Sequence, residues 1–425
     1  MGVDLRTYAD ALDFLFARTT GIWKLGLERV EAFLALLGDP HRRLRTIHVA
    51  GTNGKGSTCA TLDALLRAQG LRVGRYTSPH LVDFRERFLV DGVPVDAARI
   101  VDFVDRWTPE VERLGATFFE ATTAMAFEFF AADGVDVAVI ETGLGGRLDA
   151  TNVVTPLVAG VTNIGIDHVE YLGATREEIA FEKAGIFKPG VCAVIGEPES
   201  GIRELLRRYA QERGASPVQA VFDDGGPTAV QVTPEGTSFT LAGKDYRTPL
   251  LGAHQANNAA MAIAMLECVP PEMRPTSEAI ARGLAAVHLP GRFHRSGRYI
   301  FDVAHNPAGA TVLARTLKTV QPPRPVVAVF SVLADKDWRG MMDHLAPAVD
   351  HFVITNAPTS PSNRVWSNPE PLAYARERNL SAELVRDFDR ALARAADSGA
   401  TVLVTGSFHT VGDAMARLEV SPTAG

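Results

Sequence analysis

Short apolar runs rich in valine and isoleucine alternate along the chain with longer segments in which apolar residues recur at helical spacing. This pattern predicts an α/β fold, with buried parallel strands covered by helices on both faces. The first predicted strand, 45–51, ends in a glycine-rich stretch, and the segment after it keeps helical spacing until Gly70. A strand resumes at 71–78, which completes a βαβ unit with the glycines at its first turn. Further buried strands are predicted at 135–143, 156–165 and 190–197.

The region 216–251 differs, because glycine, proline and aspartate break it into short alternating pieces. We expect a small antiparallel sheet there, followed by a helix at 257–268. A second strand and helix series then begins, long enough for its own α/β domain, with strands at 298–307, 324–334, 351–356 and 401–407.

The predicted domains are residues 1–288 and 293–425, joined by a short linker at 289–292 that contains Pro290 and Gly291. A chain of 425 residues exceeds what one core usually organises, which also favours two domains. A cleft between two domains is the default place for a substrate.

Composition narrows the class of protein. The hydrophobic fraction of 46% and the charged fraction of 22% are those of an ordinary globular protein, and the net charge of -7 argues against a nucleic-acid partner. Cys59, Cys192 and Cys268 are too few and too scattered for a disulfide framework or a zinc site, so a reducing cytoplasm is expected. The start is not a signal peptide, and no apolar run approaches the roughly 20 residues that span a bilayer, so no membrane association is expected.

The glycine-rich stretch has the features of a phosphate-binding loop. Its glycines let backbone N–H groups approach a polyphosphate, the following helix presents its N-terminal dipole, and Lys55 adds a positive charge. In the usual signature a hydroxyl residue follows the lysine directly, whereas Gly56 intervenes here. The alternative is a plain glycine-rich turn, which the flanking strand and helix disfavour. The predicted nucleotide-binding residues of the loop are Gly51, Thr52, Asn53, Gly54, Lys55, Gly56, Ser57 and Thr58.

This loop and ten later motifs resemble one family, the folylpolyglutamate synthases and dihydrofolate synthases, within the Mur ligase group of ATP-dependent amide-forming enzymes. The motifs cover nearly the whole chain in a fixed order: GTNGKGS, YTSPHLVDFRERF, FFEATTAMAF, VIETGLGGRLDATN, GIDHVEYLG, FEKAGIFKPG, GAHQANNAA, LPGRFH, FDVAHNP, ADKDW and VTGSFHTVG. The resemblance implies a P-loop domain followed by a C-terminal Rossmann-like domain. It also implies a monomer, which is the usual state of the family.

The implied reaction joins L-glutamate to dihydropteroate, to a reduced folate, or to both. A carboxylate is a poor electrophile, so ATP first converts it to an acyl phosphate, which the amine of glutamate then attacks. Mg²⁺ and Lys55 would neutralise charge during the phosphoryl transfer. Which folate form the chain prefers is left open by the sequence.

Three positions match the metal contacts of the family, and each has a plainer alternative. Ser78 can instead cap a turn before Pro79. Glu141 ends an apolar strand, which is where ligands bind in doubly wound sheets, so a purely structural role is less expected. His168 is an unusual partner for Mg²⁺, and an isolated histidine more often makes a structural hydrogen bond.

Two further residues match the catalytic positions of the family. Glu120 is placed to orient metal-bound water, and its alternative is a cap for the following helix. Lys183 matches a lysine that carbon dioxide usually carbamylates, which turns a cation into an anion near the metals. Its alternative is an ordinary surface lysine.

Residues near and beyond the predicted linker complete the implied site. Asn258 and Arg292 match nucleotide contacts, and Asp302 and His305 match residues placed at the ATP and glutamate side. Of these two, Asp302 is assigned to the nucleotide and His305 to catalysis. Many relatives have glutamate where this chain has His294, so its contacts there are open.

Phe84 and Phe88 lie in a loop that borders the pterin pocket in the family, although aromatics four residues apart more often pack in a core.

Three other functions stay open: a P-loop kinase for a small molecule, a nucleotide-dependent switch, and a cell-wall Mur ligase. The second domain has no evident role in the first two. The motifs GTNGKGS and TSPH argue against a cell-wall Mur ligase.

Overall fold

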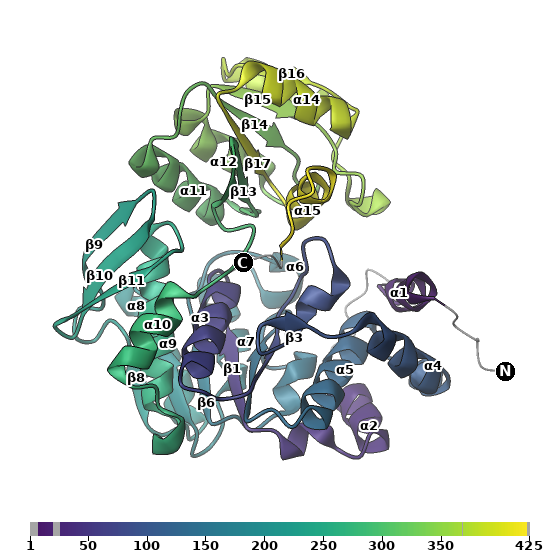
Figure 1. The fold of residues 1–425 in the computed structure, drawn as a ribbon, viewed down its shortest axis with the longest axis vertical. Helices are drawn as coiled ribbons and strands as arrows, with labels where there is room; N and C mark the ends of the chain where they lie inside the picture. The colour runs from purple at the N-terminus through teal and green to yellow at the C-terminus, as the bar shows by residue number, and fades with distance from the viewer. Residues whose placement is uncertain (1–6, 20–25, 368, 423–425) are drawn as a thin grey trace. The chain divides into compact units, whose positions relative to one another are not determined.

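The computed structural model describes residues 7–19, 26–367 and 369–422 (Figure 1). The chain divides into two compact units, each assembled from separate stretches. Unit 1 comprises Met1–Ser78, Arg85–Pro227 and Asn257–Ala286, and unit 2 comprises Pro79–Phe84, Thr228–Ala256 and Val287–Gly425.

Unit 1 is built on an eight-stranded sheet with the order β4-β3-β2-β5-β1-β6-β7-β8. The six strands from β2 to β8 are parallel, and β3 and β4 add an antiparallel edge. The strands are β1 (Thr46–Ala50), β2 (Val73–Tyr76), β3 (Phe88–Val90), β4 (Val93–Pro94), β5 (Val137–Glu141), β6 (Val158–Val161), β7 (Cys192–Ile195) and β8 (Val218–Ala220).

Every residue of the central strands β1, β5, β6 and β7 is buried, as expected for parallel strands with both faces covered. Helix α3 packs on β1, β2 and β5, and α8 packs on β7 and β8. The helices are α1 (Tyr8–Phe16), α2 (Glu28–Leu36), α3 (Lys55–Ala68), α4 (Ala97–Leu114), α5 (Phe118–Ala132), α6 (Val169–Leu172), α7 (Arg176–Lys183), α8 (Ser200–Glu212), α9 (Ala253–Glu267) and α10 (Ser277–Ala285).

Unit 2 contains two sheets. The small sheet is antiparallel with the order β11-β10-β9, and the large one has the order β12-β13-β17-β14-β15-β16, in which only β12 is antiparallel to its neighbour. The strands are β9 (Thr228–Thr233), β10 (Gly236–Leu241), β11 (Lys244–Thr248), β12 (His294–Ser296), β13 (Tyr299–Asp302), β14 (Val326–Phe330), β15 (His351–Ile354), β16 (Ala382–Leu384) and β17 (Thr401–Thr405).

The large sheet of unit 2 separates two apolar cores. Alternate residues of β14 face opposite sides, so Val326 and Phe330 pack in one core and Val327 and Val329 in the other. The helices are α11 (Pro307–Val320), α12 (Trp338–Leu345), α13 (Pro369–Glu377), α14 (Phe388–Ser398) and α15 (Phe408–Arg417). Over the described part of the chain, no helix combines the length and apolarity needed to cross a membrane.

The structure confirms the predicted α/β class and the predicted buried strands in both units. The short strands β3, β4, β12 and β16 were not predicted. The region 216–251 also differs, because it begins with β8, which pairs in parallel with β7, so only β9 to β11 form the antiparallel sheet. That small sheet groups with unit 2 rather than with the N-terminal part of the chain. The limits 1–288 and 293–425 concern folding domains and stay a prediction.

Two of the three cysteines pair, so the chain has one disulfide where the sequence predicted no disulfide framework. Cys192 at the start of β7 and Cys268 just after α9 form a disulfide, with Cα atoms 6.2 Å apart and a sequence separation of 76 residues. Helix α9 brings them together because its Met265 lies against Gly160 of the neighbouring strand β6. The third cysteine, Cys59, is a buried free thiol.

Candidate active site

The predicted ligands of unit 1 lie at the carboxyl ends of four neighbouring parallel strands, β2, β5, β1 and β6. Ser78 follows β2 by two residues, Glu141 is the last residue of β5, the glycine loop follows β1, and His168 follows β6. Ligands bind at this edge of open parallel sheets because the loops that leave the strands gather there. The strand order therefore explains why residues far apart in sequence belong to one region.

The glycine loop requires glycine at two positions. Gly51 has a φ of 149° and Gly54 a φ of 85°, which disfavour residues with a side chain. A Cβ at Gly51 would lie 1.8 Å from Oγ1 of Thr162, and one at Gly54 would lie 2.4 Å from Oδ1 of Asn258. Helix α3 starts at Lys55 directly after this turn, so its first N–H groups form an anion-binding end. The structure thus brings the predicted nucleotide contact Asn258 to the loop.

Two lysines converge on one carbonyl oxygen of the loop. Lys55 Nζ donates to the oxygen of Gly51 at 3.0 Å and to that of Thr52 at 3.2 Å. Lys183 Nζ, at the end of α7, donates to the same Gly51 oxygen at 2.9 Å. The Lys183 side chain is buried, with the residue 4% exposed, so it is not the surface lysine of the alternative reading. Burial, and after it the charge of Lys55, lowers the pKa of Lys183 to about 7.

The Glu141 carboxylate lies between the end of β2 and the start of α3. Its Oε2 accepts from the backbone N–H of Ser78 at 3.1 Å and lies 3.9 Å from the position that a Cβ on Gly56 would occupy. Carboxylate and hydroxyl oxygens are hard donors that suit Mg²⁺, which keeps several waters and needs few protein ligands. Consistent with few ligands, no three His, Cys, Asp or Glu side chains in residues 7–19, 26–367 and 369–422 are grouped to hold a metal. The Glu141 carboxylate is a ligand type that suits such an ion, and the roles of Glu141 and Ser78 as metal ligands stay a prediction.

His168 lies at the start of the short helix α6 with a left-handed φ of 53°. Its backbone N–H donates to Oδ1 of Asp167 at 2.9 Å, and its Nε2 lies 3.9 Å from the same oxygen. These contacts place the imidazole beside a carboxylate on its own loop. Its role as a metal ligand stays a prediction.

Glu120 is engaged in the cap of α5. Its Oε2 accepts from the backbone N–H of Thr117 at 2.7 Å, and Thr117 Oγ1 accepts from the N–H of Glu120, which completes a capping box. Arg29 also pairs with its carboxylate at 3.0 Å. The capping alternative is therefore present in the structure, and a catalytic role for Glu120 stays a prediction.

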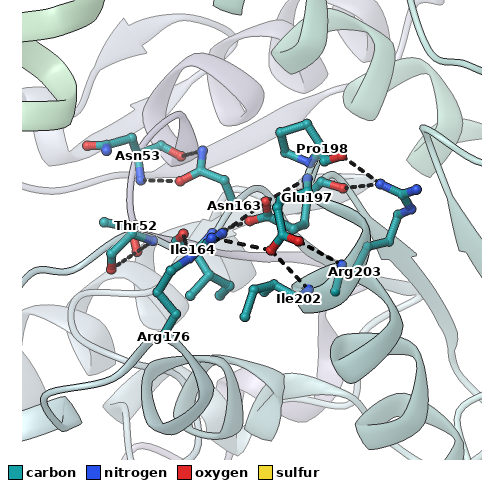
Figure 2. Close-up of polar contacts among 12 residues, drawn as sticks. Thr52, Asn53, Asn163, Ile164, Arg176, Glu197, Pro198, Ile202 and Arg203 are labelled. Atoms are coloured by element: carbon teal, nitrogen blue, oxygen red, sulfur yellow. Dashed lines mark hydrogen bonds and ion pairs between the residues drawn. The ribbon is translucent and has the colours of Figure 1, made fainter.

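The sequence analysis missed two residues at this strand edge, Asn163 after β6 and Glu197 after β7. Asn163 Oδ1 accepts from the N–H of Asn53 at 3.1 Å, and its Nδ2 donates to the Asn53 oxygen at 2.8 Å (Figure 2). Glu197 is 2% exposed and accepts from the N–H of Ile164 at 2.7 Å. The signal that finds both is the one used for Glu141: a polar residue that closely follows an apolar strand.

In unit 2, Asp302 ends β13 and its neighbours include two other predicted residues. Its carboxylate accepts from the N–H groups of Phe293 and Ala304, both at 2.9 Å. Burial raises the pKa of Asp302, and the charge of Arg292 opposes that rise. His305 Nδ1 lies 2.9 Å from the oxygen of Val303.

The aromatic ring of Phe408, the first residue of α15, links Arg292 and His305. The Arg292 guanidinium lies 5.4 Å from its ring centroid, and the His305 ring lies 5.9 Å from it. His294, the departure from many relatives, is the first residue of β12 and has its ring 6.2 Å from that of Phe301. The carboxyl ends of β13 and β17 thus gather the predicted residues of unit 2.

The two loop aromatics are packed. Phe84 is 2% exposed and Phe88 is 0% exposed. Phe88 lies in β3 and stacks on Tyr76 with ring centroids 5.7 Å apart. Core packing, the alternative that the sequence favoured, is what the structure shows.

Known protein families match residues of both units. The family described as Mur ligase middle domain matches residues 49–266, and the family described as Mur ligase, glutamate ligase domain matches residues 291–408. The chain is 35% identical to a dihydrofolate synthase/folylpolyglutamate synthase of Bacillus subtilis (strain 168), over 97% of this chain and 99% of that protein.

Solved structures also resemble this chain over nearly its whole length. The Mycobacterium tuberculosis folylpolyglutamate synthase complexed with ADP has a TM-score of 0.89 and 35% identity, and the match covers 98% of this chain and 99% of that one. A bifunctional folylpolyglutamate synthase/dihydrofolate synthase with Mn, AMPPNP and L-glutamate bound has a TM-score of 0.79 and 36% identity, over 96% and 98% of the two chains.

Proposed function

The chain belongs to the dihydrofolate synthase/folylpolyglutamate synthase family of Mur ligases, and from this premise we propose how its residues perform the reaction. It is an ATP-dependent ligase that adds L-glutamate to dihydropteroate, to reduced folates, or to both. One observation carries the assignment of the phosphoryl-transfer site: two lysines meet on the Gly51 oxygen of a glycine loop whose neighbour is the Glu141 carboxylate.

The reaction has two steps. In the first, a carboxylate oxygen of the pterin-containing substrate attacks the γ-phosphorus of ATP, and ADP leaves with the bridging oxygen. In the second, the amine of glutamate attacks the acyl carbon, loses a proton, and expels inorganic phosphate. The loop N–H groups and Lys55 hold the phosphates and offset the charge that develops during transfer.

Glu141 and Ser78 would hold Mg²⁺, with His168 as a third ligand. When bound, the ion supplies positive charge to the phosphate oxygens. The residues of the chain fix where that charge can lie, because the Ser78 N–H orients the carboxylate of Glu141 at the start of α3. Glu120 is assigned to orienting water in this region in addition to capping α5.

Lys183 works as a carbamate in this proposal. Two ammonium groups on one carbonyl oxygen repel each other, and a buried lysine with a lowered pKa exposes a larger share of neutral amine to carbon dioxide. The amine nitrogen bonds to the carbon of carbon dioxide and releases one proton, which leaves a carboxylate. The new anion attracts Lys55 and the metal, so the site that favours its formation also stabilises it.

In unit 2, Arg292 and Asp302 are assigned to the nucleotide, as is Asn258 of unit 1. His305 is assigned to glutamate. The support is that Arg292, Asp302 and His305 gather at the carboxyl end of β13, where ligands bind in doubly wound sheets. The working form is proposed to be a monomer, the usual state of the family, in the cytoplasm.

Phosphate release, assayed separately with dihydropteroate and with tetrahydrofolate, tests the function and identifies the substrate. We expect ADP and phosphate to form only when ATP, L-glutamate and one of these acceptors are all present. Phosphate that stays on an organic product would indicate a kinase. Slow hydrolysis that ignores glutamate would indicate a nucleotide-dependent switch.

A further inference from the structure

The peptide groups around Ile164 are held from both ends by an ion pair between Glu197, which is buried, and Arg176, which is partly exposed (Figure 2). Glu197 Oε2 accepts from the N–H of Ile164 at 2.7 Å, and Arg176 Nε donates to the oxygen of Ile164 at 3.0 Å. The two clamping side chains also bind each other, with Arg176 Nη2 3.2 Å from Glu197 Oε1. Charge-assisted hydrogen bonds of this kind are stronger than neutral ones, so the backbone of Ile164 has little freedom to turn.

The residues on either side of Ile164 face the glycine loop. The oxygen of Asn163 accepts from the N–H of Thr52 at 2.9 Å. Thr52 Oγ1 exchanges two hydrogen bonds with the peptide groups of Gly165, at 2.9 and 3.1 Å. Neighbouring residues of an extended backbone direct their N–H and C=O groups to opposite sides, which explains how one segment serves two partners.

The contacts with Asn53 fix the direction of a carbonyl group. Its oxygen accepts from Thr162 Oγ1 at 2.6 Å and from Asn163 Nδ2 at 2.8 Å. A carbonyl oxygen that turned toward bound phosphate would repel it, whereas the N–H groups that follow in the loop attract it. The segment 162–165 therefore holds the loop with its donors available to the nucleotide.

We propose that Glu197, together with Arg176, is a positioning residue for the nucleotide: the pair holds Ile164, and the flanking residues hold the phosphate-binding loop in its binding conformation. This inference rests on the proposed function for the identity of the nucleotide. The Glu197 carboxylate accepts from the N–H groups of Ile164 and Glu199 and from Arg176, and its link to the glycine loop runs through the segment 162–165. Its loss would leave the Ile164 N–H without its carboxylate acceptor and would remove one of the two carboxylates that pair with Arg176.

The test compares three variants by ADP titration calorimetry and by the KM for ATP and for L-glutamate. Measurements are made well below the thermal midpoint of each variant, so that only folded protein contributes. Glu197→Ala should weaken ADP binding and raise the KM for ATP by roughly ten- to a hundredfold, because small displacements of binding groups carry large penalties. The KM for L-glutamate should change much less. Glu197→Gln keeps an acceptor for the Ile164 N–H and should fall between Glu197→Ala and the parent.

Glu199→Ala is the matched control. Glu199 also pairs with Arg176, at 3.3 Å, and caps α8, but its side chain accepts from Gly201 and Ile202 rather than from the segment 162–165. It should lower the thermal midpoint while the affinity for ADP stays that of the parent.

A Glu197→Ala protein that is folded and binds ADP like the parent would overturn the proposal. Equal losses of ADP affinity in Glu197→Ala and Glu199→Ala would also overturn it, since they would show a general structural effect. If Glu197→Ala does not fold, Glu197→Gln decides: an ADP affinity at least threefold below the parent supports the proposal, and an unchanged affinity refutes it. Failure of the proposed function would look different, because the parent itself would then bind ADP without glutamate-dependent phosphate release.

Discussion

Replacement of Lys183 gives the sharpest test of the carbamate. Lys183→Ala removes a buried side chain whose nitrogen lies 2.9 Å from the Gly51 oxygen. A pKa of about 7 in place of 10.5 raises the neutral share of the amine at pH 7 from about 1 in 3,000 to about one half. Because only the neutral amine reacts with carbon dioxide, the site gains roughly a thousandfold in reactive amine over a surface lysine.

We expect Lys183→Ala to lose most of the ligase activity and to recover part of it when formate or acetate supplies the missing carboxylate. Lys183→Arg should not recover, because its bulk and positive charge remain. Labelled bicarbonate and carbon NMR on the folded parent should show a carbamate signal that denaturation removes. The signal should weaken as the pH falls below about 7, where the amine becomes protonated. Absence of the signal, together with parental activity in Lys183→Ala, would refute the reasoning.

Three further outcomes are expected. Lys55→Ala should lower kcat/KM about a hundredfold or more with little change in the thermal midpoint, since the Lys55 ammonium donates to carbonyl oxygens of the glycine loop; parental turnover would contradict its role in charge neutralisation. Gly51→Ala should abolish ADP binding in calorimetry, because its Cβ would lie 1.8 Å from Oγ1 of Thr162, and normal binding would show that this approach is not required. In buffer free of carbon dioxide, Lys183→Met should be more stable than the parent below pH 7. At that pH the folded parent buries a charged ammonium that its unfolded chain exposes to water. That advantage should shrink as the pH rises from about 7 toward 10.5, and pH-independent melting differences would contradict the lowered pKa.

The parts of the site that local pattern controls were predictable from the sequence. The glycine loop and Lys55 follow from a strand, a tight turn and a helix that are consecutive in the chain, and Glu141 follows from its place at the end of an apolar strand. The same rule reaches Asn163 and Glu197, which follow predicted strands closely. It does not say which polar residue at such an edge touches a ligand and which supports one that does.

Other features depend on packing between distant segments. The burial of Lys183 arises because the end of α7 meets the glycine loop 132 residues earlier in the chain, and no local pattern records that contact. Strand β8 has three residues, and its parallel pairing with β7 crosses a whole helix. The meeting of Cys192 and Cys268 has the same origin, because two separate elements set it.

Transfer of a labelled oxygen tests the acyl phosphate most directly. The acceptor, dihydropteroate or tetrahydrofolate, is prepared with oxygen-18 in the reacting carboxylate, and the phosphate released during ligation is examined by mass spectrometry. The account predicts that each amide formed yields one phosphate that carries one labelled oxygen, because the carboxylate oxygen bonds to phosphorus and leaves with it. Phosphate without label, formed at the rate of ligation, would contradict it.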